Sequence, residues 1–190
     1  GLSMLCAGGA EMLLGRTGNA KTTLEEARVR LKNAGHTKGE GIATSMTGQL
    51  EAYVGQLEEA ELKLAMGTQL GEIAEVKRLV AWNCAILAVL TLLQGREEDA
   101  HNYLEYGWVI FETEGDVPGL AVTLWVDALR LWWLGDERHA EAETRRVERI
   151  LTIVRDGPAL AACATAMAHV LRFIDRDDEA RRALDKAREG

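Results

Sequence analysis

The chain has 190 residues, of which 47% are hydrophobic and 27% charged, and its formal net charge is −8. Such a chain can build a sizeable core without covalent staples. The negative charge argues against direct nucleic-acid binding and against anionic membranes. The longest apolar run, at 85–93, is too short to span a bilayer, and we expect no signal peptide. We therefore expect a cytoplasmic protein with no membrane association.

The first predicted helix, 1–14, begins a pattern that repeats every forty residues. We number the columns of this forty-residue unit from residue 1. Column 15 holds Gly15, Gly55, Gly95, Gly135 and Asp175, and column 20 holds Ala20, Ala60, Ala100, Ala140 and Ala180. Column 8 holds Gly8, Gly48, Ala88, Ala128 and Ala168. Five units agree without a gap, which predicts a repeat architecture.

Each unit predicts two helices. Glycine at column 15 ends the first helix, an acidic or polar residue soon starts the second, and the alanine at column 20 marks a close helix crossing. The predicted helices after 1–14 are 17–34, 39–54, 57–70, 73–94, 97–113, 118–134, 137–155, 158–173 and 176–189. We expect Gly71 to end the helix at 57–70 early.

The units are predicted at about 1–38, 39–74, 75–116, 117–156 and 157–190 within one domain. Columns 2, 6 and 13 are apolar or small in every unit, so we expect them to form the core face of the first helices. Helix pairs of this kind cannot bury their apolar faces alone and must stack. The sequence therefore predicts an all-α fold, a right-handed solenoid of about five antiparallel helix pairs.

The same columns resemble the tetratricopeptide repeat. Gly8, Gly15, Ala20 and Ala27 match that family's small-residue positions, as do most of their successors. The period is 40 instead of 34, and the family's aromatic at column 11 is replaced by Glu11, Glu51, Thr91, Leu131 and Leu171. HEAT and armadillo repeats also have periods near forty, but they lack the glycine-to-alanine spacing, so they are the second choice.

The segment 115–142, "GDVPGLAVTLWVDALRLWWLGDERHAEA", resembles the helical sensor region of bacterial LuxR-type and maltose-activator-like ATP-binding transcription regulators. That resemblance implies a region that receives a ligand or partner protein and relays the signal to ATPase and DNA-binding modules. Neither module lies in this chain. The chain begins Gly-Leu-Ser inside a repeat, so we interpret it as an excised piece of a larger protein.

Little of the sequence suggests catalysis or a cofactor. "GRTGNAKTT" (15–23) resembles a phosphate loop, but Ala20 replaces its second glycine and no strand precedes it. The four histidines lack metal-ligand spacing, and no nucleophile and base set can be assembled. Cys6, Cys84 and Cys163 have no Cys-x-x-Cys spacing, which favours buried free thiols. We expect no enzyme activity, no cofactor and no metal.

Tryptophans supply the candidate binding site. In tetratricopeptide proteins, several first-helix columns line the concave face, and that mapping predicts an apolar groove here, with core packing as the alternative. The candidate residues are Trp82, Val89, Val122, Trp125, Asp127, Leu129 and Trp132. Asp127 interrupts an apolar column, as an exposed acid or as a polar anchor.

We expect a scaffold that binds a protein or peptide, as the sensor or interaction domain of a bacterial transcription regulator. The alternative is a small-molecule sensor with an aromatic pocket around Trp125 and Trp132. An open apolar groove would favour the peptide, and a closed cavity with convergent polar groups the metabolite. Self-association stays open.

Overall fold

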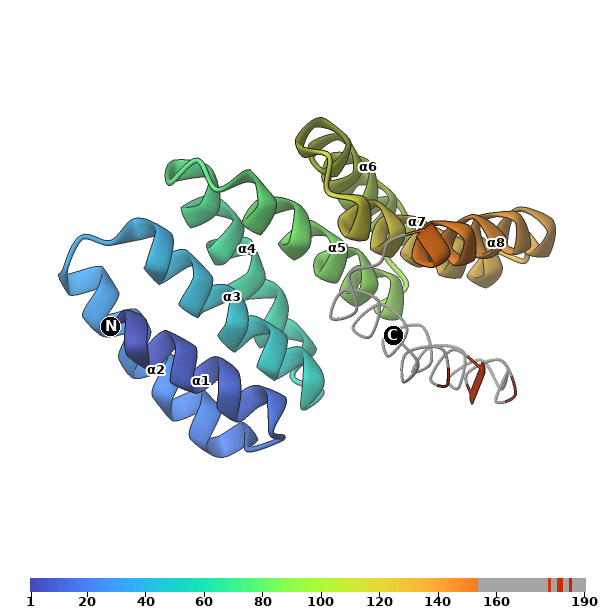
Figure 1. The fold of residues 1–190 in the computed structure, drawn as a ribbon. Coiled ribbons are helices and arrows are strands. Elements are labelled where there is room, and N and C mark those ends of the chain that lie inside the picture. Colours follow the sequence, from blue (N-terminus) through green and yellow to red (C-terminus); the bar gives the residue numbers. More distant parts are fainter. Residues whose placement is uncertain (154–177, 179–180, 183–184, 186–190) are drawn as a thin grey trace. The chain divides into compact units, whose positions relative to one another are not determined.

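The computed structural model describes residues 1–153, 178, 181–182 and 185. Every regular element among them is an α-helix, in keeping with the predicted fold class (Figure 1). In chain order the helices are α1 (Leu2–Leu13), α2 (Thr17–Asn33), α3 (Thr37–Tyr53), α4 (Leu57–Ile73), α5 (Lys77–Leu93), α6 (Glu97–Glu114), α7 (Val117–Trp133) and α8 (Glu137–Ile153). The helices predicted at 158–173 and 176–189, and Cys163, lie outside the described residues apart from a few isolated positions.

The forty-residue period of the sequence is also the period of the helices. First helices α3, α5 and α7 begin at Thr37, Lys77 and Val117, and each runs for 17 residues. The chain divides into two compact units, 1–110 and 111–190, and each is described here by itself. In the first unit α1, α3 and α5 follow one another side by side, paired with the second helices α2 and α4 (Figure 1).

Small residues allow the two helices of a pair to approach closely. Ala20, Ala60, Ala100 and Ala140 are all buried, as the sequence predicts. On the facing helix, a methyl group added at Gly8 would lie 2.7 Å from the Leu24 side chain. One added at Gly48 would lie 3.1 Å from the Ala60 carbonyl oxygen. In the α3–α4 pair the two small columns are therefore in direct contact.

The turn glycines at column 15 have the predicted left-handed conformation, with φ between 71° and 83° at Gly15, Gly55, Gly95 and Gly135. A second left-handed position occurs at column 35, where one pair meets the next. Gly35 and Gly115 occupy it with φ of 68° and 65°, whereas Glu75 occupies it with φ of 55°. Glu75 is the one described non-glycine residue with a positive φ.

The prediction that Gly71 ends a helix is wrong, because α4 continues to Ile73. Gly71 is buried instead, and a methyl group there would lie 3.1 Å from Val80 Cγ2 and 3.5 Å from Leu79 Cδ2. The glycine makes room for the next first helix. The helix stops at the left-handed residue Glu75, which a search for glycine and proline could not find.

The two described cysteines are free thiols in different surroundings. Cys84 is buried, and burial raises the pKa of its thiol to about 12, with a smaller contribution from Glu72. Cys6 is exposed, which corrects the expectation that it is buried. The Cys84 thiol is therefore protonated and unreactive at neutral pH.

Candidate functional site

The first helices of the first unit each present one strip of side chains to solvent. On α3 five partly or fully exposed residues follow one another at spacings of three and four, which places them on one face of the helix. They are Lys38, Ile42, Met46, Gln49 and Tyr53. Their counterparts are Arg78, Trp82, Ile86, Val89 and Leu93 on α5, and Leu2, Cys6, Gly9 and Leu13 on α1. We call this set the first-helix stripe.

The first-helix stripe contains columns 2, 6 and 13, which the sequence predicts to form the core face, and that prediction is wrong at column 13. At columns 2 and 6, Ile42, Met46 and Ile86 are half-buried against the core, and Val126 is buried. At column 13, Leu13, Tyr53 and Leu93 are 88%, 77% and 45% exposed. The buried side of α3 carries Leu50 and otherwise mostly small and polar residues, among them Gly41, Ala43, Thr44, Ser45, Thr47 and Gly48. Closely packed helices need small residues between them, and the large Tyr53 side chain lies on the open side.

Large apolar residues gather where the first helices end. Leu14 and Val54 follow column 13 directly and are 67% and 50% exposed. Together with Leu13, Tyr53 and Leu93 they form a row at the ends of α1, α3 and α5, which we call the apolar rim. Exposed apolar residues are ordinary when scattered, but larger exposed apolar patches are typical of interaction surfaces, so the apolar rim is a candidate for one.

The predicted site residues divide between the two units. Trp82 and Val89 lie half-buried on α5, in the first-helix stripe. Val122, Leu129 and Trp132 are half-buried on α7, in the second unit. The grouping of all seven residues into one groove stays a prediction. The apolar rim was missed, although the apolar column 13 beside each turn glycine was visible in the sequence.

Trp125 and Asp127 have more local roles than the sequence could assign. Trp125 is only 8% exposed and belongs to the core, which is the packing alternative of the sequence analysis. Asp127 is partly exposed and its Oδ1 accepts a hydrogen bond from Arg130 Nε at 2.7 Å, one turn along α7. A Trp125 ring packed in the core cannot serve as the anchor of an open groove.

A charged network lies between helices of the first unit at column 11, where tetratricopeptide repeats carry an aromatic. The Glu51 side chain is only 3% exposed, and its Oε1 lies 2.6 Å from Lys63 Nζ and 3.3 Å from Lys21 Nζ. Lys63 Nζ also donates to Glu25 Oε1 at 3.0 Å. In the first forty-residue repeat, Thr23 Oγ1 donates to Glu11 Oε2 at 2.8 Å. The residues at columns 11 and 23 therefore form a polar pair in each of the first two repeats.

The ionisation of this network follows from its contacts. Burial would raise the pKa of Glu25, but hydrogen bonds from Arg28 and Lys63 outweigh it and lower that pKa. Burial would likewise lower the pKa of Lys63, but hydrogen bonds to Glu51 and Glu25 outweigh it and raise that pKa. Both groups are charged at neutral pH. The network therefore joins α2, α3 and α4 by ion pairs where an apolar contact would be expected.

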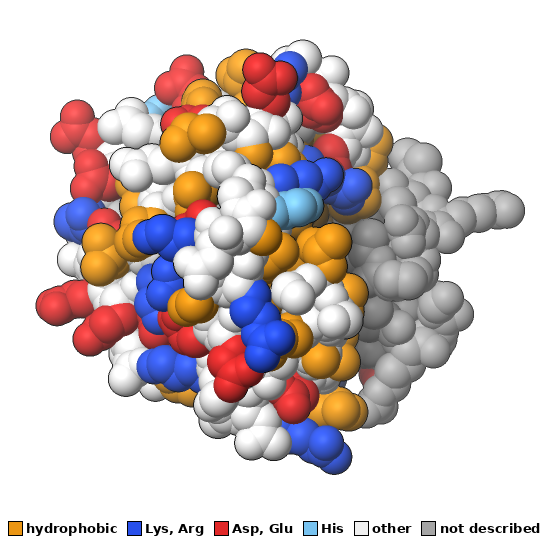
Figure 2. Space-filling view, turned by 90° about the vertical axis from the view of Figure 1, so that its left-hand side faces the viewer, with side chains coloured by type: hydrophobic (Ala, Val, Ile, Leu, Met, Phe, Trp, Pro, Cys, Tyr) orange, Lys and Arg blue, Asp and Glu red, His pale blue; other side chains and the backbone are white. Residues whose placement is uncertain are grey.

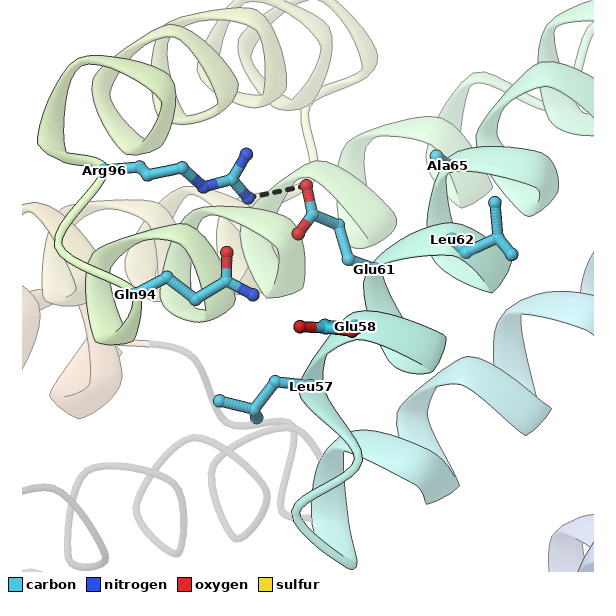
Figure 3. Close-up of a pocket in the computed structure, with 7 residues that line it drawn as sticks. All are labelled: Leu57, Glu58, Glu61, Leu62, Ala65, Gln94 and Arg96. Atoms are coloured by element: carbon cyan, nitrogen blue, oxygen red, sulfur yellow. Dashed lines mark hydrogen bonds and ion pairs between the residues drawn. The ribbon is translucent and has the colours of Figure 1, made fainter.

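An open pocket of about 750 Å³ lies beside α4 in the first unit (Figure 3). Its lining comes from the start of α4 and from the turn between α5 and α6, and consists of Leu57, Glu58, Glu61, Leu62, Ala65, Gln94 and Arg96. Arg96 Nη2 donates to Glu61 Oε1 at 2.6 Å across the pocket. The opening is therefore partly acidic and partly apolar.

Other chemistry has little support in the described part of the chain. It holds no group of three or more histidine, cysteine or acidic residues that could bind a metal. His139 Nδ1 lies 2.8 Å from Asp136 Oδ2 in an exposed local pair. None of the described helices is both long and apolar enough to cross a membrane. The face drawn in Figure 2 mixes acidic, basic and hydrophobic side chains, and it carries no large area with charges of one sign only.

Comparison with solved structures identifies the class of fold. Aspartyl phosphate phosphatase F from Bacillus subtilis is similar with a TM-score of 0.72 at 16% identity, over 94% of this chain and 45% of that chain. BtubC from P. vanneervenii has a TM-score of 0.68 at 14% identity, over 96% of this chain and 76% of that one. A putative kinesin light chain from Podosopora anserina, with nearly identical TPR-like repeats, has a TM-score of 0.62 at 16% identity, over 98% and 92%.

These similarities confirm the all-α, tetratricopeptide-like repeat fold. At such low identities they establish the fold alone. The chain spans less than half the length of the phosphatase chain that it matches. No known protein-family model matches the sequence, and neither does any curated protein.

Proposed function

We propose that the chain is a non-catalytic scaffold that binds a protein or peptide segment on the first-helix stripe of its first unit. The observation that carries the proposal is the apolar rim. Leu13, Tyr53 and Leu93 are large, exposed, and at the same column of successive first helices. Exposed apolar and aromatic side chains contribute strongly to binding when a partner removes them from water.

The arrangement of the stripe favours an extended or helical segment over a small molecule. Its residues recur from α1 to α3 to α5 and so form a row of similar apolar positions along successive helices. A metabolite site would instead bring polar groups together in an enclosed cavity. The small-molecule alternative depended on an aromatic pocket around Trp125 and Trp132, and of these two rings Trp125 is in the core, whereas Trp132 is half-buried.

We further propose that this scaffold is the sensor or interaction region of a bacterial transcription regulator. The support is the resemblance of 115–142 to such regions, including the Gly115-Asp116 pair directly before α7. Sequencing the complete gene tests this assignment directly. A reading frame that continues into an ATPase and a DNA-binding module supports it, and a frame without either contradicts it.

Selection of peptides from a random display library on the immobilised protein tests the binding role. Selected peptides should bind the wild-type protein and should bind the Tyr53→Ser and Leu13→Ser variants at least tenfold more weakly. A tenfold loss corresponds to about 1.4 kcal/mol of binding free energy, as expected when a central apolar anchor is removed. Val29→Ser, at an exposed apolar residue on α2, is the control and should bind normally. Equal losses in all three variants, or peptides that ignore them, would contradict the proposal.

A further inference from the structure

The outer face of α4 is more apolar than the same face of α2. Leu62, Met66 and Ile73 are 64%, 43% and 73% exposed. At about 100° per residue they lie within about 40° of one another around the helix. The same three columns of α2 carry Thr22, Glu26 and Asn33. This apolar strip is separate from the first-helix stripe, because it lies on a second helix and not on α1, α3 or α5.

Acidic residues flank the strip on the side toward α6. At the same rotation per residue, Glu58, Glu61 and Glu72 lie about 40–140° from the apolar residues on that side. The chain itself provides basic and hydroxyl donors to two of them. Arg96 Nη2 lies 2.6 Å from Glu61 Oε1, and the Tyr106 hydroxyl donates to Glu72 Oε1 at 3.3 Å. The flank thus already binds a guanidinium group, while Glu58 stands exposed beside it.

The open pocket continues the strip at the N-terminal end of α4. Figure 3 shows the carboxylates of Glu58 and Glu61 on the same side of α4 as Gln94 and Arg96, while Leu62 extends from another part of the helix surface. The pocket of about 750 Å³ can therefore take a side chain that is apolar along its stem and basic at its tip. Lysine and arginine have this form.

We propose that the outer face of α4 is a second docking surface, and that its occupant is a basic amphipathic helix of a partner protein. The apolar residues of that helix would pack on Leu62, Met66 and Ile73. Its lysine or arginine residues would face the acidic flank. From Leu62 to Ile73 the strip spans about three helical turns, which matches apolar anchors repeated every three or four residues along a partner helix. Charge complementarity favours a basic partner, because three carboxylates face the single guanidinium group of Arg96 on this flank and an acidic helix would be repelled.

Fluorescence anisotropy with a labelled amphipathic peptide of about 14 leucine and lysine residues tests the proposal. The matched probe carries glutamate in place of every lysine. The basic peptide should bind, more weakly as salt is raised, and at least tenfold more tightly than the acidic one. Leu62→Ser and Ile73→Ser should each weaken binding about tenfold, and Glu58→Lys about threefold or more. Circular dichroism checks that each variant is folded, and Met66→Gln replaces either variant that is not.

Val29→Ser on α2 is the control for an exposed apolar residue elsewhere, and Tyr53→Ser is the control for the first-helix stripe. Both should bind the basic peptide like the wild type. Equal binding of the two peptides, or equal affinity of Leu62→Ser and Val29→Ser, would overturn the proposal. So would light scattering that shows a dimer abolished by Leu62→Ser, since a second copy would then occupy the face. A loss of binding with Tyr53→Ser alone would assign the peptide to the stripe.

Discussion

The two junctions between helix pairs in the first unit connect similar helices by different means. At the first junction, Leu31 of α2 is large and Gly39 of α3 is small, and a methyl group at Gly39 would lie 2.9 Å from Leu31 Cδ2. At the second, the sizes are reversed, with Gly71 on α4 and Leu79 on α5. The third junction, in the second unit, returns to the first arrangement with Phe111 and Gly119. One large and one small residue fill each junction.

The junctions differ at two further positions. At the first junction, the residue before α3 caps that helix with its side chain: His36 Nδ1 accepts a hydrogen bond from Gly39 N at 2.9 Å. Asp116 does the same at the third, accepting from Gly119 N at 3.0 Å. Val76 at the second junction has no such group, and Glu75 before it takes the left-handed conformation that glycine takes elsewhere. The second junction therefore depends more on packing and less on local backbone preferences.

Substitutions that change the sizes of the two side chains at the second junction should have the largest effect on stability. Gly71→Leu should destabilise the protein by about 2–3 kcal/mol, because its side chain would overlap Leu79 and Val80. The double variant Gly71→Leu with Leu79→Gly restores the arrangement of the first junction and should recover all but about 1 kcal/mol. Urea unfolding followed by circular dichroism measures both. Additive losses would contradict the idea that the two residues share one space.

Left-handed residues should respond in opposite directions at the two junctions. Gly35→Ala should cost about 1–2 kcal/mol, because a Cβ disfavours a φ of 68°. Glu75→Gly should stabilise by about 0.5–1 kcal/mol, since relief of the same strain exceeds the extra entropy of glycine in the unfolded chain. Thermal melts compare the two variants. A destabilised Glu75→Gly would mean that the Glu75 side chain contributes more than its backbone conformation costs.

A cap introduced at the second junction should have a smaller effect. The backbone at Val76 has φ −96° and ψ 72°, close to −92° and 73° at His36. Val76→Asp can therefore accept a hydrogen bond at the start of α5 and should stabilise by about 0.5–1 kcal/mol. Asp116→Ala at the third junction should cost about 1 kcal/mol. Val76→Asn should also stabilise, and failure of both variants would show that the half-buried site penalises polar groups.

Acid should weaken the first junction more than the second, by less than about 1 kcal/mol. The Glu25–Lys63 pair joins α2 to α4 across the first junction, and the corresponding residues across the second are Ala65 and Tyr103. The folded pKa of Glu25 lies below its usual 4.5, so its contribution is complete above that pH and is lost as the pH falls through the folded value. The difference in unfolding free energy between wild type and Glu25→Gln should therefore shrink below about pH 4.5.

The repeat was predictable because it rests on residues with one structural use. Glycine at column 15 allows a left-handed turn, and alanine at column 20 allows two helices to cross closely. The spacing between them therefore defined the helix pair. Gly71 was misassigned because glycine also has a second use, as a small residue inside a helix. A buried helical glycine and a turn glycine look alike in sequence, and only the size of Leu79 across the junction separates them.

The candidate site was harder to predict because apolar periodicity does not state which side of a helix is covered. Columns 2, 6 and 13 form a clear helical face, yet Tyr53 and Leu93 lie on the open side, since the packed side is filled by small residues such as Gly48. Trp125 shows the converse, an aromatic mapped to a groove by family analogy that is buried in the core. Whether an apolar face is covered depends on the neighbouring helices.

The alternation of sizes at the junctions limits how such a gene can change in length. Removing the forty residues 37–76 would join the end of α2 to the start of α5 and set Leu31 against Leu79, two large side chains in a space that holds one. Removing the eighty residues 37–116 would instead join Leu31 to Gly119, a combination that already fits at the first junction. In-frame recombination within this stretch should therefore be tolerated in steps of two repeats and selected against in steps of one.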